Sequence, residues 1–395
     1  MGSGQYDDVR LPPEVSAAMK PIKVLHVTNV EKENYYLVNL ADHTDPSDVE
    51  FSFVTFGSAD CEFVQDFQRR GLKAVGLDSL GRGAYPQAYR GIKSILATAA
   101  PDIVHAHLFD PALVALFAAR RAGIYTVLTR HHSDAIHVIT SSVKRRFYLA
   151  VDSYISRLAD HIIAPSRMVR EFLVEREGVA DNKVTVLPYG QTTGRFDAVT
   201  PEKISSLRSE LSMDGRLSLV CVSRLNHRKG HKFLFAAMAE LIREGLDAQV
   251  ILVGDGDEKA ALETLAASLG IHDRVVFLGW RDDALAVLAA GDIVVHPSLE
   301  DALSSAVIEA IMLEKPIVAT DISGVRDSLD DGRYGVIVAP ESSVSIVAGI
   351  RDVLKDIGAA RKRAAAGRKF LLEYMSSQRV ADETLCIYKR VLGQL

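Results

Sequence analysis

Short runs of branched apolar residues, each bounded by turn-forming residues, recur along the whole chain. In the first half they cover residues 22–28, 51–56, 102–107, 125–130, 161–166 and 183–190. In the second half they cover residues 217–224, 249–256, 274–280, 292–298, 316–321 and 335–340. Within each run the apolar residues are continuous rather than alternating with polar ones, which is typical of parallel strands buried on both faces of a sheet.

Amphipathic segments separate these runs and predict helices that cover the sheets. Residues 231–245 and 258–270 are examples, and the second ends at Gly270, a residue type that commonly terminates helices. Strands and helices alternate in two blocks. We therefore expect an α/β protein of two Rossmann-like, doubly wound domains that face each other across a cleft.

The stretch richest in Gly, Thr and Pro between the two blocks is residues 190–203, and it predicts the domain boundary. We assign residues 1–190 to an N-terminal domain and residues 191–375 to a C-terminal domain. Residues 376–395 form a predicted helix, which we expect to pack back on the N-terminal domain.

The charge balance excludes one broad class of function. The 395 residues include 46 basic and 51 acidic side chains, a net charge of −5 with histidines neutral. General nucleic-acid binders have a strongly basic surface, so we expect no nucleic-acid partner. With 48% hydrophobic and 25% charged residues, the chain has the composition of an ordinary globular protein.

The cysteines and the N-terminus bear on the compartment. Cys61, Cys221 and Cys386 are odd in number and far apart, which fits neither a disulfide framework nor a zinc site and indicates a reducing compartment. The first 20 residues lack the apolar stretch of a signal peptide. No run approaches the roughly 20 apolar residues of a membrane-spanning helix. We expect a cytoplasmic protein, with peripheral attachment to the inner membrane face as an open possibility.

Polar residues that could carry chemistry follow the predicted strands. Ligands of open parallel sheets bind beyond the carboxyl ends of the strands, so these residues should line the cleft. They are His105, His107, His131, His132, Arg224, Gly254, Ser298 and Asp301.

Arg224 and Lys229 leave one predicted strand end together, and Gly230 opens the next helix. Arginine offers a rigid fork of donors and lysine a mobile point charge, a combination that suits phosphate oxygens. A solvated basic turn is the alternative, and the neighbouring Arg228 fits that interpretation.

A single acidic residue interrupts a helix that is otherwise apolar on every face. Glu309 stands within residues 306–313, and a buried carboxylate is costly unless a partner satisfies it. Ribose hydroxyls would be suitable donors. Ser304 and Ser305 stand where the helix should begin, and the free amides of a first turn favour anions. The alternative is a capped core helix whose glutamate pairs with an Arg or Lys.

Four segments stand in the order and spacing of a known family. VSRLNHRKG, VGDGDEKAAL, FLGW and PSLEDALSSAVIEAIMLEKPIVATDISGV together resemble the retaining GT-B glycosyltransferases of family 4, which use nucleotide sugars. The first block is similar more loosely, through IVHAHLFDPAL, TVLTRHH and HIIAPSRMVREFL. The resemblance implies a GT-B fold with an acceptor-binding N-terminal domain and a donor-binding C-terminal domain.

The resemblance also implies roles for individual residues. Arg224 and Lys229 would bind the donor diphosphate without a metal, and Glu309 would hold the ribose. Asp301, eight positions before Glu309, would contact the transferred sugar, and His131 would lie over that sugar from the acceptor domain. The remaining donor-side candidates are Gly254 and Trp280 beside the base, Ser298, and the backbone around Leu303, Ser304 and Ser305. His107 and His132 are the acceptor-side candidates.

Two positions depart from the family pattern. Asp301 is one methylene shorter than the usual glutamate. Residues 29–44 contain no glycine, although family members usually have a Gly-Gly loop after the first strand.

Three further motifs favour a structural interpretation. Asp255-Gly-Asp257 spells a metal-binding pattern of the other large glycosyltransferase fold, but it stands where a strand should turn into a helix. Gly254-x-Gly256 begins a dinucleotide fingerprint whose third glycine is replaced by Lys259. The histidines near residue 131 lack a fourth ligand of a zinc-binding type, so we expect neither a metal nor another cofactor.

Residues 141–160 form an amphipathic segment with Lys144, Arg145 and Arg146 at its head. The simpler interpretation is a solvated helix face. The alternative is a dock for an anionic membrane surface, which would suit an enzyme with a lipid-linked acceptor.

The expected function is retaining transfer of a sugar from a nucleoside diphosphate sugar to a hydroxyl of a glycan or lipid-linked acceptor. Three alternatives remain open. One is a non-catalytic nucleotide-sugar-binding subunit, and another is a GT-B epimerase. The third is a glycoside hydrolase that uses Asp301 and Glu309 as its carboxylate pair, which would leave the Arg–Lys pair without a role.

Overall fold

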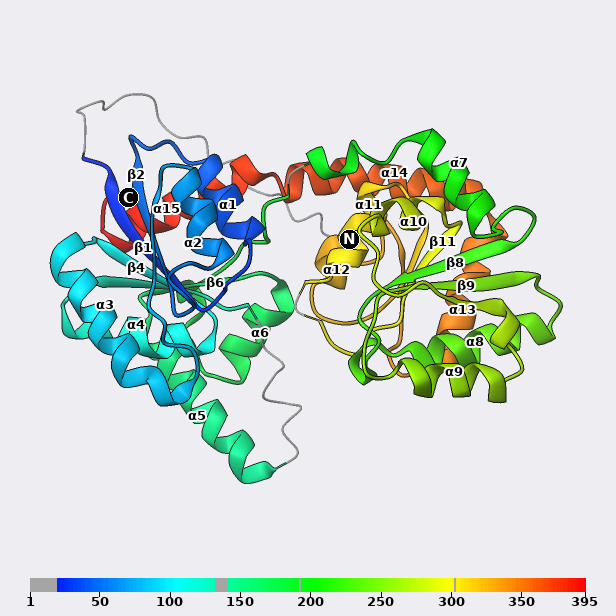
Figure 1. The fold of residues 1–395 in the computed structure, drawn as a ribbon, viewed down its shortest axis with the longest axis horizontal. Helices are drawn as coiled ribbons and strands as arrows, with labels where there is room; N and C mark the ends of the chain where they lie inside the picture. The colour runs from blue at the N-terminus through cyan, green and yellow to red at the C-terminus, as the bar shows by residue number, and fades with distance from the viewer. Residues whose placement is uncertain (1–19, 132–140, 192, 302) are drawn as a thin grey trace.

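Residues 20–131, 141–191, 193–301 and 303–395 are described in this computed structural model, and they form two lobes built on separate sheets (Figure 1). The first sheet has the strand order β3-β2-β1-β4-β5-β6-β7, and every pairing in it is parallel. Its strands are β1 (Ile22–Thr28), β2 (Val49–Thr55), β3 (Lys73–Gly76), β4 (Ile103–His107), β5 (Tyr125–Thr129), β6 (His161–Ala164) and β7 (Val184–Val186).

The second sheet has the order β10-β9-β8-β11-β12-β13 and is also parallel throughout. Its strands are β8 (Leu217–Val222), β9 (Ala248–Val253), β10 (Val275–Phe277), β11 (Ile293–His296), β12 (Ile317–Thr320) and β13 (Val336–Val338). In both sheets the order reverses beside the first strand of the block, which is the doubly wound arrangement predicted from the sequence.

Helices cover both faces of each sheet. The first lobe carries α1 (Tyr35–Asp42), α2 (Glu62–Arg69), α3 (Tyr85–Ala99), α4 (Phe109–Arg121), α5 (Ser142–Leu158) and α6 (Arg167–Glu175). The second carries α7 (Pro201–Glu210), α8 (His231–Arg243), α9 (Lys259–Ser268), α10 (Ala284–Ala290), α11 (Ser305–Met312), α12 (Val325–Ser328), α13 (Ser343–Lys355) and α14 (Ile357–Tyr374).

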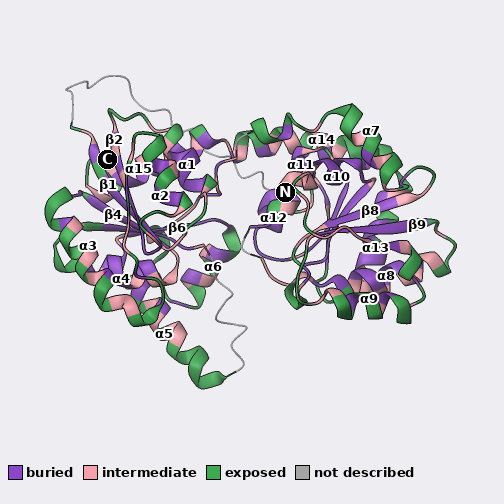
Figure 2. Cartoon of the chain, in the orientation of Figure 1, coloured by how far each residue is buried: buried purple, intermediate pink, exposed green. Residues whose placement is uncertain are grey.

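Each sheet has a hydrophobic core on both sides, which explains the continuous apolar runs (Figure 2). Side chains of successive strand residues point to opposite faces. In β1, Val24 packs on one side and Leu25 on the other, and in β8 Leu219 and Val220 divide in the same way. Because neither face is open to solvent, polar groups of the central strands reach solvent at the strand ends.

The last helix, α15 (Ser377–Val391), returns from the second lobe to the first (Figure 1). Gln191 and Ser376 form an isolated parallel bridge where the two connections between the lobes pass each other. Beyond that point Val380 and Tyr388 join the core beneath β1 and β2. The first lobe is therefore completed by the C-terminal end of the chain.

A direct contact between the lobes is polar. Arg167, the first residue of α6, donates from Nε to Asp327 Oδ1 of α12 at 2.7 Å and from Nη1 to Asp331 Oδ2 at 3.0 Å. Ser166 and Ser323 hydroxyls lie 3.0 Å apart beside this ion pair.

The structure differs from the sequence prediction in two strands. β3 was not predicted, because it is a four-residue edge strand whose alternate side chains, such as Lys73, are exposed. β7 ends at Val186, whereas the apolar run predicted a strand to residue 190. None of the described helices combines the length and apolarity needed to cross a membrane.

Candidate functional site

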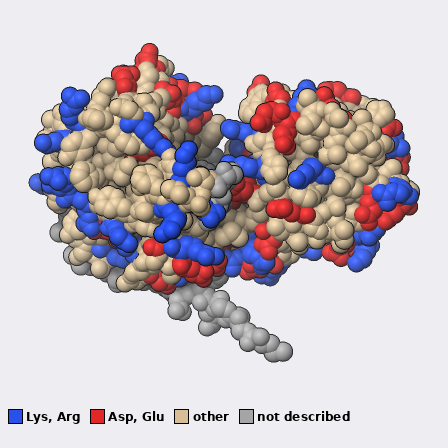
Figure 3. All heavy atoms as spheres, turned by 90° about the horizontal axis from the view of Figure 1, so that it is seen from below, with Lys and Arg blue, Asp and Glu red and all other residues tan. Residues whose placement is uncertain are grey.

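A cavity of about 260 Å³ lies between the lobes, at the carboxyl ends of strands from both sheets. The first lobe contributes Thr28, Val30, Asn34, His107, Leu108, His131 and Tyr189, and the second contributes Asp301 and Leu303. Viewed from below, the lobes are separated by a furrow with basic side chains on its rims (Figure 3). Of the strand-end residues expected to line a cleft, His107, His131 and Asp301 line this cavity. His105, Arg224, Gly254 and Ser298 are not among its lining residues.

The centre of the second-lobe side is an ion pair. Lys229 Nζ donates to Asp301 Oδ2 at 2.8 Å, and the two side chains are 18% and 25% exposed. The pair joins the turn after β8 to the turn after β11. Hydrogen bonds from Leu299 N (2.7 Å) and the Ser298 hydroxyl (3.2 Å) to Arg228 O hold the same two turns together.

Two glycines let neighbouring turns at the strand ends approach each other closely. Gly230 has φ +64°, and a Cβ there would lie 2.1 Å from Pro297 O. Gly254 has φ +133°, and a Cβ there would lie 2.0 Å from Ser223 O. The Asp255-Gly-Asp257 segment lies in the connection between β9 and α9, as expected for a β–α turn.

The start of α11 differs from the expected capping. Ser304 is the N-cap residue by position, but its side chain makes no capping hydrogen bond. Its hydroxyl lies 3.0 Å from His296 Nε2 at the end of β11 instead. Burial and, to a smaller extent, the nearby Lys229 lower the pKa of His296 to about 4 although the Asp301 carboxylate opposes the shift, so the imidazole is neutral near pH 7. The first amides of α11 therefore keep their capacity to bind an anion.

Glu309 is paired with an arginine, as required by the alternative in which α11 is simply a core helix. Arg195 Nη1 donates to Glu309 Oε1 at 2.9 Å, and the Glu309 side chain is 13% exposed. Burial raises the pKa of Glu309, and the charge and hydrogen bond of Arg195 oppose that rise. The carboxylate of this apolar helix is thus satisfied by Arg195, which follows the predicted domain boundary.

Three further donor-side candidates are Arg224, Gly254 and Trp280. Arg224 is exposed, and its side chain makes no hydrogen bond or ion pair with any other described residue. Gly254 N donates to Gly279 O at 2.8 Å, which brings Gly254 beside Trp280. The Trp280 side chain is 79% exposed, although its Nε1 bonds to Asp282 at 3.3 Å.

Histidines form the first-lobe side. His107 Nδ1 lies 3.3 Å from His131 Nε2, and His131 Nδ1 lies 2.7 Å from the Tyr189 hydroxyl. Leu108, directly after His107, has φ +66°, an uncommon conformation for leucine that persists only when the surrounding structure holds it. His132, the second acceptor-side candidate, lies outside the described residues.

Sequence reasoning did not single out Tyr189, His296 or Arg195. His296 follows the same strand-end pattern as His107 and could have been found by that signal. Tyr189 was included in a predicted strand. Where the family has a Gly-Gly loop, side chains of Val30 and Asn34 line the cavity, and Asn34 also caps α1 by accepting from Leu37 N at 3.1 Å.

Comparisons with known proteins agree on one family. A family model described as "Glycosyl transferases group 1" matches residues 216–356, and one described as "Glycosyltransferase Family 4" matches residues 34–195. The 2-deoxystreptamine glucosyltransferase of Streptomyces kanamyceticus is 29% identical over 305 residues, 74% of this chain and 78% of that protein. A glycogen synthase of Mycobacterium tuberculosis is 28% identical over 295 residues, 73% of this chain and 68% of that protein.

Solved structures share the fold. The Anabaena protein HepE in complex with UDP superposes with a TM-score of 0.77 and 21% identity, covering 95% of this chain and all of that one. Its complex with UDP-glucose gives a TM-score of 0.75 with the same coverage. The comparisons therefore agree with the two-lobed GT-B architecture expected from the sequence.

The close approach at Gly230 generates a stability prediction. Gly230→Ala places a methyl group against a backbone carbonyl in addition to forcing alanine to positive φ, whereas Gly245→Ala has the same conformational problem (φ +95°) with open space around the Cβ. We expect Gly245→Ala to lower the free energy of unfolding by roughly 1–2 kcal/mol, and Gly230→Ala to lower it by clearly more. Urea denaturation measures both, and equal losses would contradict the close-packing argument.

Proposed function

The chain belongs to the group 1, family 4 glycosyltransferases, and we propose that it transfers a sugar from a nucleoside diphosphate sugar to an acceptor hydroxyl with retention at the anomeric carbon. One observation carries the proposal. Asp301, which is paired with Lys229, and Leu303, which lies just before α11, line one cavity with His131 of the opposite lobe. Groups suited to a phosphate and to a sugar therefore lie around one space. The chemistry below follows from that arrangement.

Departure of the nucleotide is the step that the second lobe favours. When the bond from the anomeric carbon to the diphosphate breaks, negative charge develops on phosphate oxygens. Lys229 and the first amides of α11 are held in place before the reaction, and the exposed Arg224 adds a further positive charge. Preorganised donors of this kind contribute about 3–4 kcal/mol each to lowering a barrier.

Asp301 can stabilise the positive charge that develops on the sugar. The sugar becomes positive as the diphosphate leaves, and a carboxylate at the cavity wall favours that charge. We assign no carboxylate as a covalent nucleophile, because Asp301 and Glu309 are each held by a cation, Lys229 and Arg195. The acceptor hydroxyl therefore attacks from the face that the diphosphate leaves, and the departing phosphate takes its proton.

The proposed donor is a uridine diphosphate sugar. Support comes from the fold neighbour HepE, which was crystallised with UDP and with UDP-glucose. The ribose would exchange hydrogen bonds with Glu309, beside Arg195, and the base would lie near Gly254 and Trp280. Ser298 and the backbone of Leu303 to Ser305 complete the proposed donor site.

A thermal-shift panel of UDP-, GDP- and ADP-sugars tests the donor assignment. A ligand at 100 times its dissociation constant stabilises the folded state by about 2.7 kcal/mol, so we expect a rise in Tm with UDP-sugars. Arg224→Ala should keep the unliganded Tm, lose most of that rise and lower the transfer rate at least tenfold. Arg243→Ala, an exposed arginine at the far end of α8, is the matched control and should behave as wild type.

Other outcomes of this panel would favour the alternatives. Binding of a donor without hydrolysis or transfer to any acceptor tried would indicate a non-catalytic nucleotide-sugar-binding subunit. Conversion of the donor sugar to its epimer, followed by NMR with no acceptor present, would indicate an epimerase. Wild-type transfer by Arg224→Ala would contradict the phosphate site.

We also propose that transfer needs no metal ion. Lys229, Arg224 and the α11 amides supply the positive charge that a divalent cation would otherwise bring to the diphosphate. We therefore expect dialysis against EDTA to change the initial rate by less than twofold. A loss that added Mg²⁺ or Mn²⁺ restores would contradict this part of the proposal.

The proposed acceptor is a hydroxyl of a glycan or a lipid-linked glycan, used by a cytoplasmic enzyme at the inner membrane face. The support is α5, which projects from the first lobe (Figure 1). Val143 and Phe147 are exposed one turn apart on it, beside exposed Lys144, Arg145 and Arg146. Apolar and basic side chains together at a helix end suit an anionic lipid surface.

Vesicle flotation tests this surface. We expect the protein to float with vesicles containing 30% phosphatidylglycerol (about one anionic lipid in three) and not with pure phosphatidylcholine, because each basic residue adds about 1 kcal/mol near an anionic surface. Replacement of Lys144, Arg145 and Arg146 by Gln should abolish flotation. The same replacement of Arg361, Lys362 and Arg363 on α14 is the control, and equal loss in both variants would argue against α5 as the dock.

A further inference from the structure

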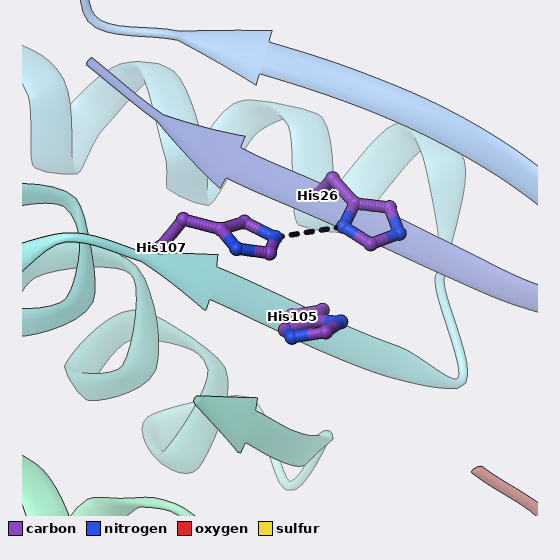
Figure 4. A group of neighbouring side chains, drawn as sticks. All are labelled: His26, His105 and His107. Carbon is purple, nitrogen blue, oxygen red and sulfur yellow. Dashed lines mark hydrogen bonds between the residues drawn. The ribbon is translucent and has the colours of Figure 1, made fainter. Parts of the chain in front are cut away.

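A chain of hydrogen bonds leads from the cavity into the first lobe. Tyr189, at the cavity wall, bonds through its hydroxyl to His131 Nδ1 at 2.7 Å. His131 Nε2 lies 3.3 Å from His107 Nδ1, and His107 Nε2 lies 2.9 Å from His26 Nδ1 (Figure 4). These residues come from β1, β4 and the segments that follow β5 and β7.

The chain continues to the C-terminal helix. His26 Nε2 lies 3.5 Å from the Tyr388 hydroxyl, which lies 2.7 Å from His105 Nδ1. His105 Nε2 then meets the Thr129 hydroxyl at 2.7 Å. We call the sequence of groups from Tyr189 to Thr129 the histidine relay.

The three inner histidines, His26, His105 and His107, could also be taken for a metal site, because nitrogen atoms from all three lie within 4.8 Å of one another. Each of their six ring nitrogens, however, already has a partner in the relay. A metal ion would have to displace these bonds. We therefore assign the cluster to hydrogen bonding.

The inner histidines are neutral. Burial lowers the pKa of His26 to about 3 and lowers the pKa of His105 and His107 well below their usual value, with neighbouring histidines adding to the shift. A neutral imidazole carries one N–H, so it donates once and accepts once. In an unbroken chain the direction of one bond therefore fixes the direction of all the others.

Burial at the inner end selects between the two directions. Thr129 is 1% exposed, and the buried Tyr36 hydroxyl, which has no hydrogen-bond partner of normal length among the described residues, lies beside it. If the Thr129 hydrogen points to His105 Nε2, the Thr129 donor is satisfied and its oxygen stays open to the Tyr36 hydroxyl. Leaving a buried donor unsatisfied is costly. The opposite end, Tyr189, is half-buried at the cavity and can direct its hydrogen to solvent or substrate.

We propose that the relay runs outward, from Thr129 to Tyr189, and that Tyr189 presents its phenolic hydrogen to a substrate oxygen in the cavity. Tyr189 is then a further substrate-contacting residue, and His107 and Tyr388 are positioning residues that act on it through the relay. Successive bonds in such a chain polarise one another and strengthen the terminal donor. The catalytic consequence rests on the proposed glycosyltransferase function, whereas the direction of the relay does not.

The outward direction fixes the tautomer of four residues. His105, His26, His107 and His131 must each carry their proton on Nδ1, whereas the inward direction places every proton on Nε2. Histidine-selective ¹⁵N NMR of the full-length protein without ligands separates these tautomers by nitrogen shift. We expect four Nδ1–H signals, assigned by single His→Asn variants. Nε2–H signals, or mixtures of tautomers, from these residues would overturn the proposal whatever the protein transfers.

Tyr388→Phe tests whether the relay is continuous. It removes the hydroxyl between His105 and His26 but keeps the buried ring, so the fold should persist. We expect mixed tautomers at His107 and His131, although Tyr388 makes no hydrogen bond to either of them. Tyr154→Phe, at an exposed tyrosine of α5, is the matched control and should leave all four signals unchanged. Unchanged signals at His131 in Tyr388→Phe would refute coupling along the chain.

Kinetics test the consequence for catalysis. We expect Tyr189→Phe to lower kcat roughly tenfold, which corresponds to the loss of one hydrogen bond to the substrate. We expect Tyr388→Phe to lower kcat severalfold and to leave the KM for the donor unchanged. His107→Asn, which keeps a polar atom near the Nδ1 position, should retain more activity than His107→Gln. If Tyr189→Phe kept full activity while the four Nδ1–H signals were unchanged, the substrate contact of Tyr189 would be refuted but the direction of the relay would not. If no variant or wild type transferred sugar, the proposed function would fail while the NMR result stood.

Discussion

Parallel strands that are buried on both faces can offer functional side chains only at their ends, and both sheets of this protein direct their carboxyl ends to the same cavity. This constraint explains why residues as distant in sequence as Thr28 and Leu303 line one space. Each strand end that reaches the cavity contributes only one or two polar residues to it. The doubly wound topology places the site before any particular side chain is chosen.

Charge pairing keeps the site stable without substrate. Lys229 is held by Asp301, and Arg195 is held by Glu309, so the second-lobe groups that would bind a diphosphate or a ribose already have partners. A nucleotide bound at the proposed site would compete with these pairs, but the side chains would lose little further freedom when it bound. Arg224 is exposed and makes no such pair with the described residues, so in the proposed function its guanidinium would be available to a phosphate.

Local pattern was sufficient for most of the fold and for the strand-end residues. Continuous apolar runs located the central strands, and Gly270, at φ +69°, follows α9 as its sequence predicted. The edge strand β3 was not predicted, because four residues whose side chains are alternately exposed form no continuous apolar run. Ser304 occupied the predicted cap position but bonded to His296, a choice set by the neighbouring strand and not by the helix itself.

The partners that sequence could not supply come from remote parts of the chain. Of the two histidines in the strand IVHAH, His105 is fully buried and His107 lines the cavity. Nothing local to that strand shows that His26 and Tyr388 complete its hydrogen bonds, because Tyr388 arrives on a helix that crosses from the other lobe. The crossing of α15 therefore has a consequence beyond stability. A residue near the end of the chain is bonded, through histidines of the central strands, to the wall where the two lobes meet.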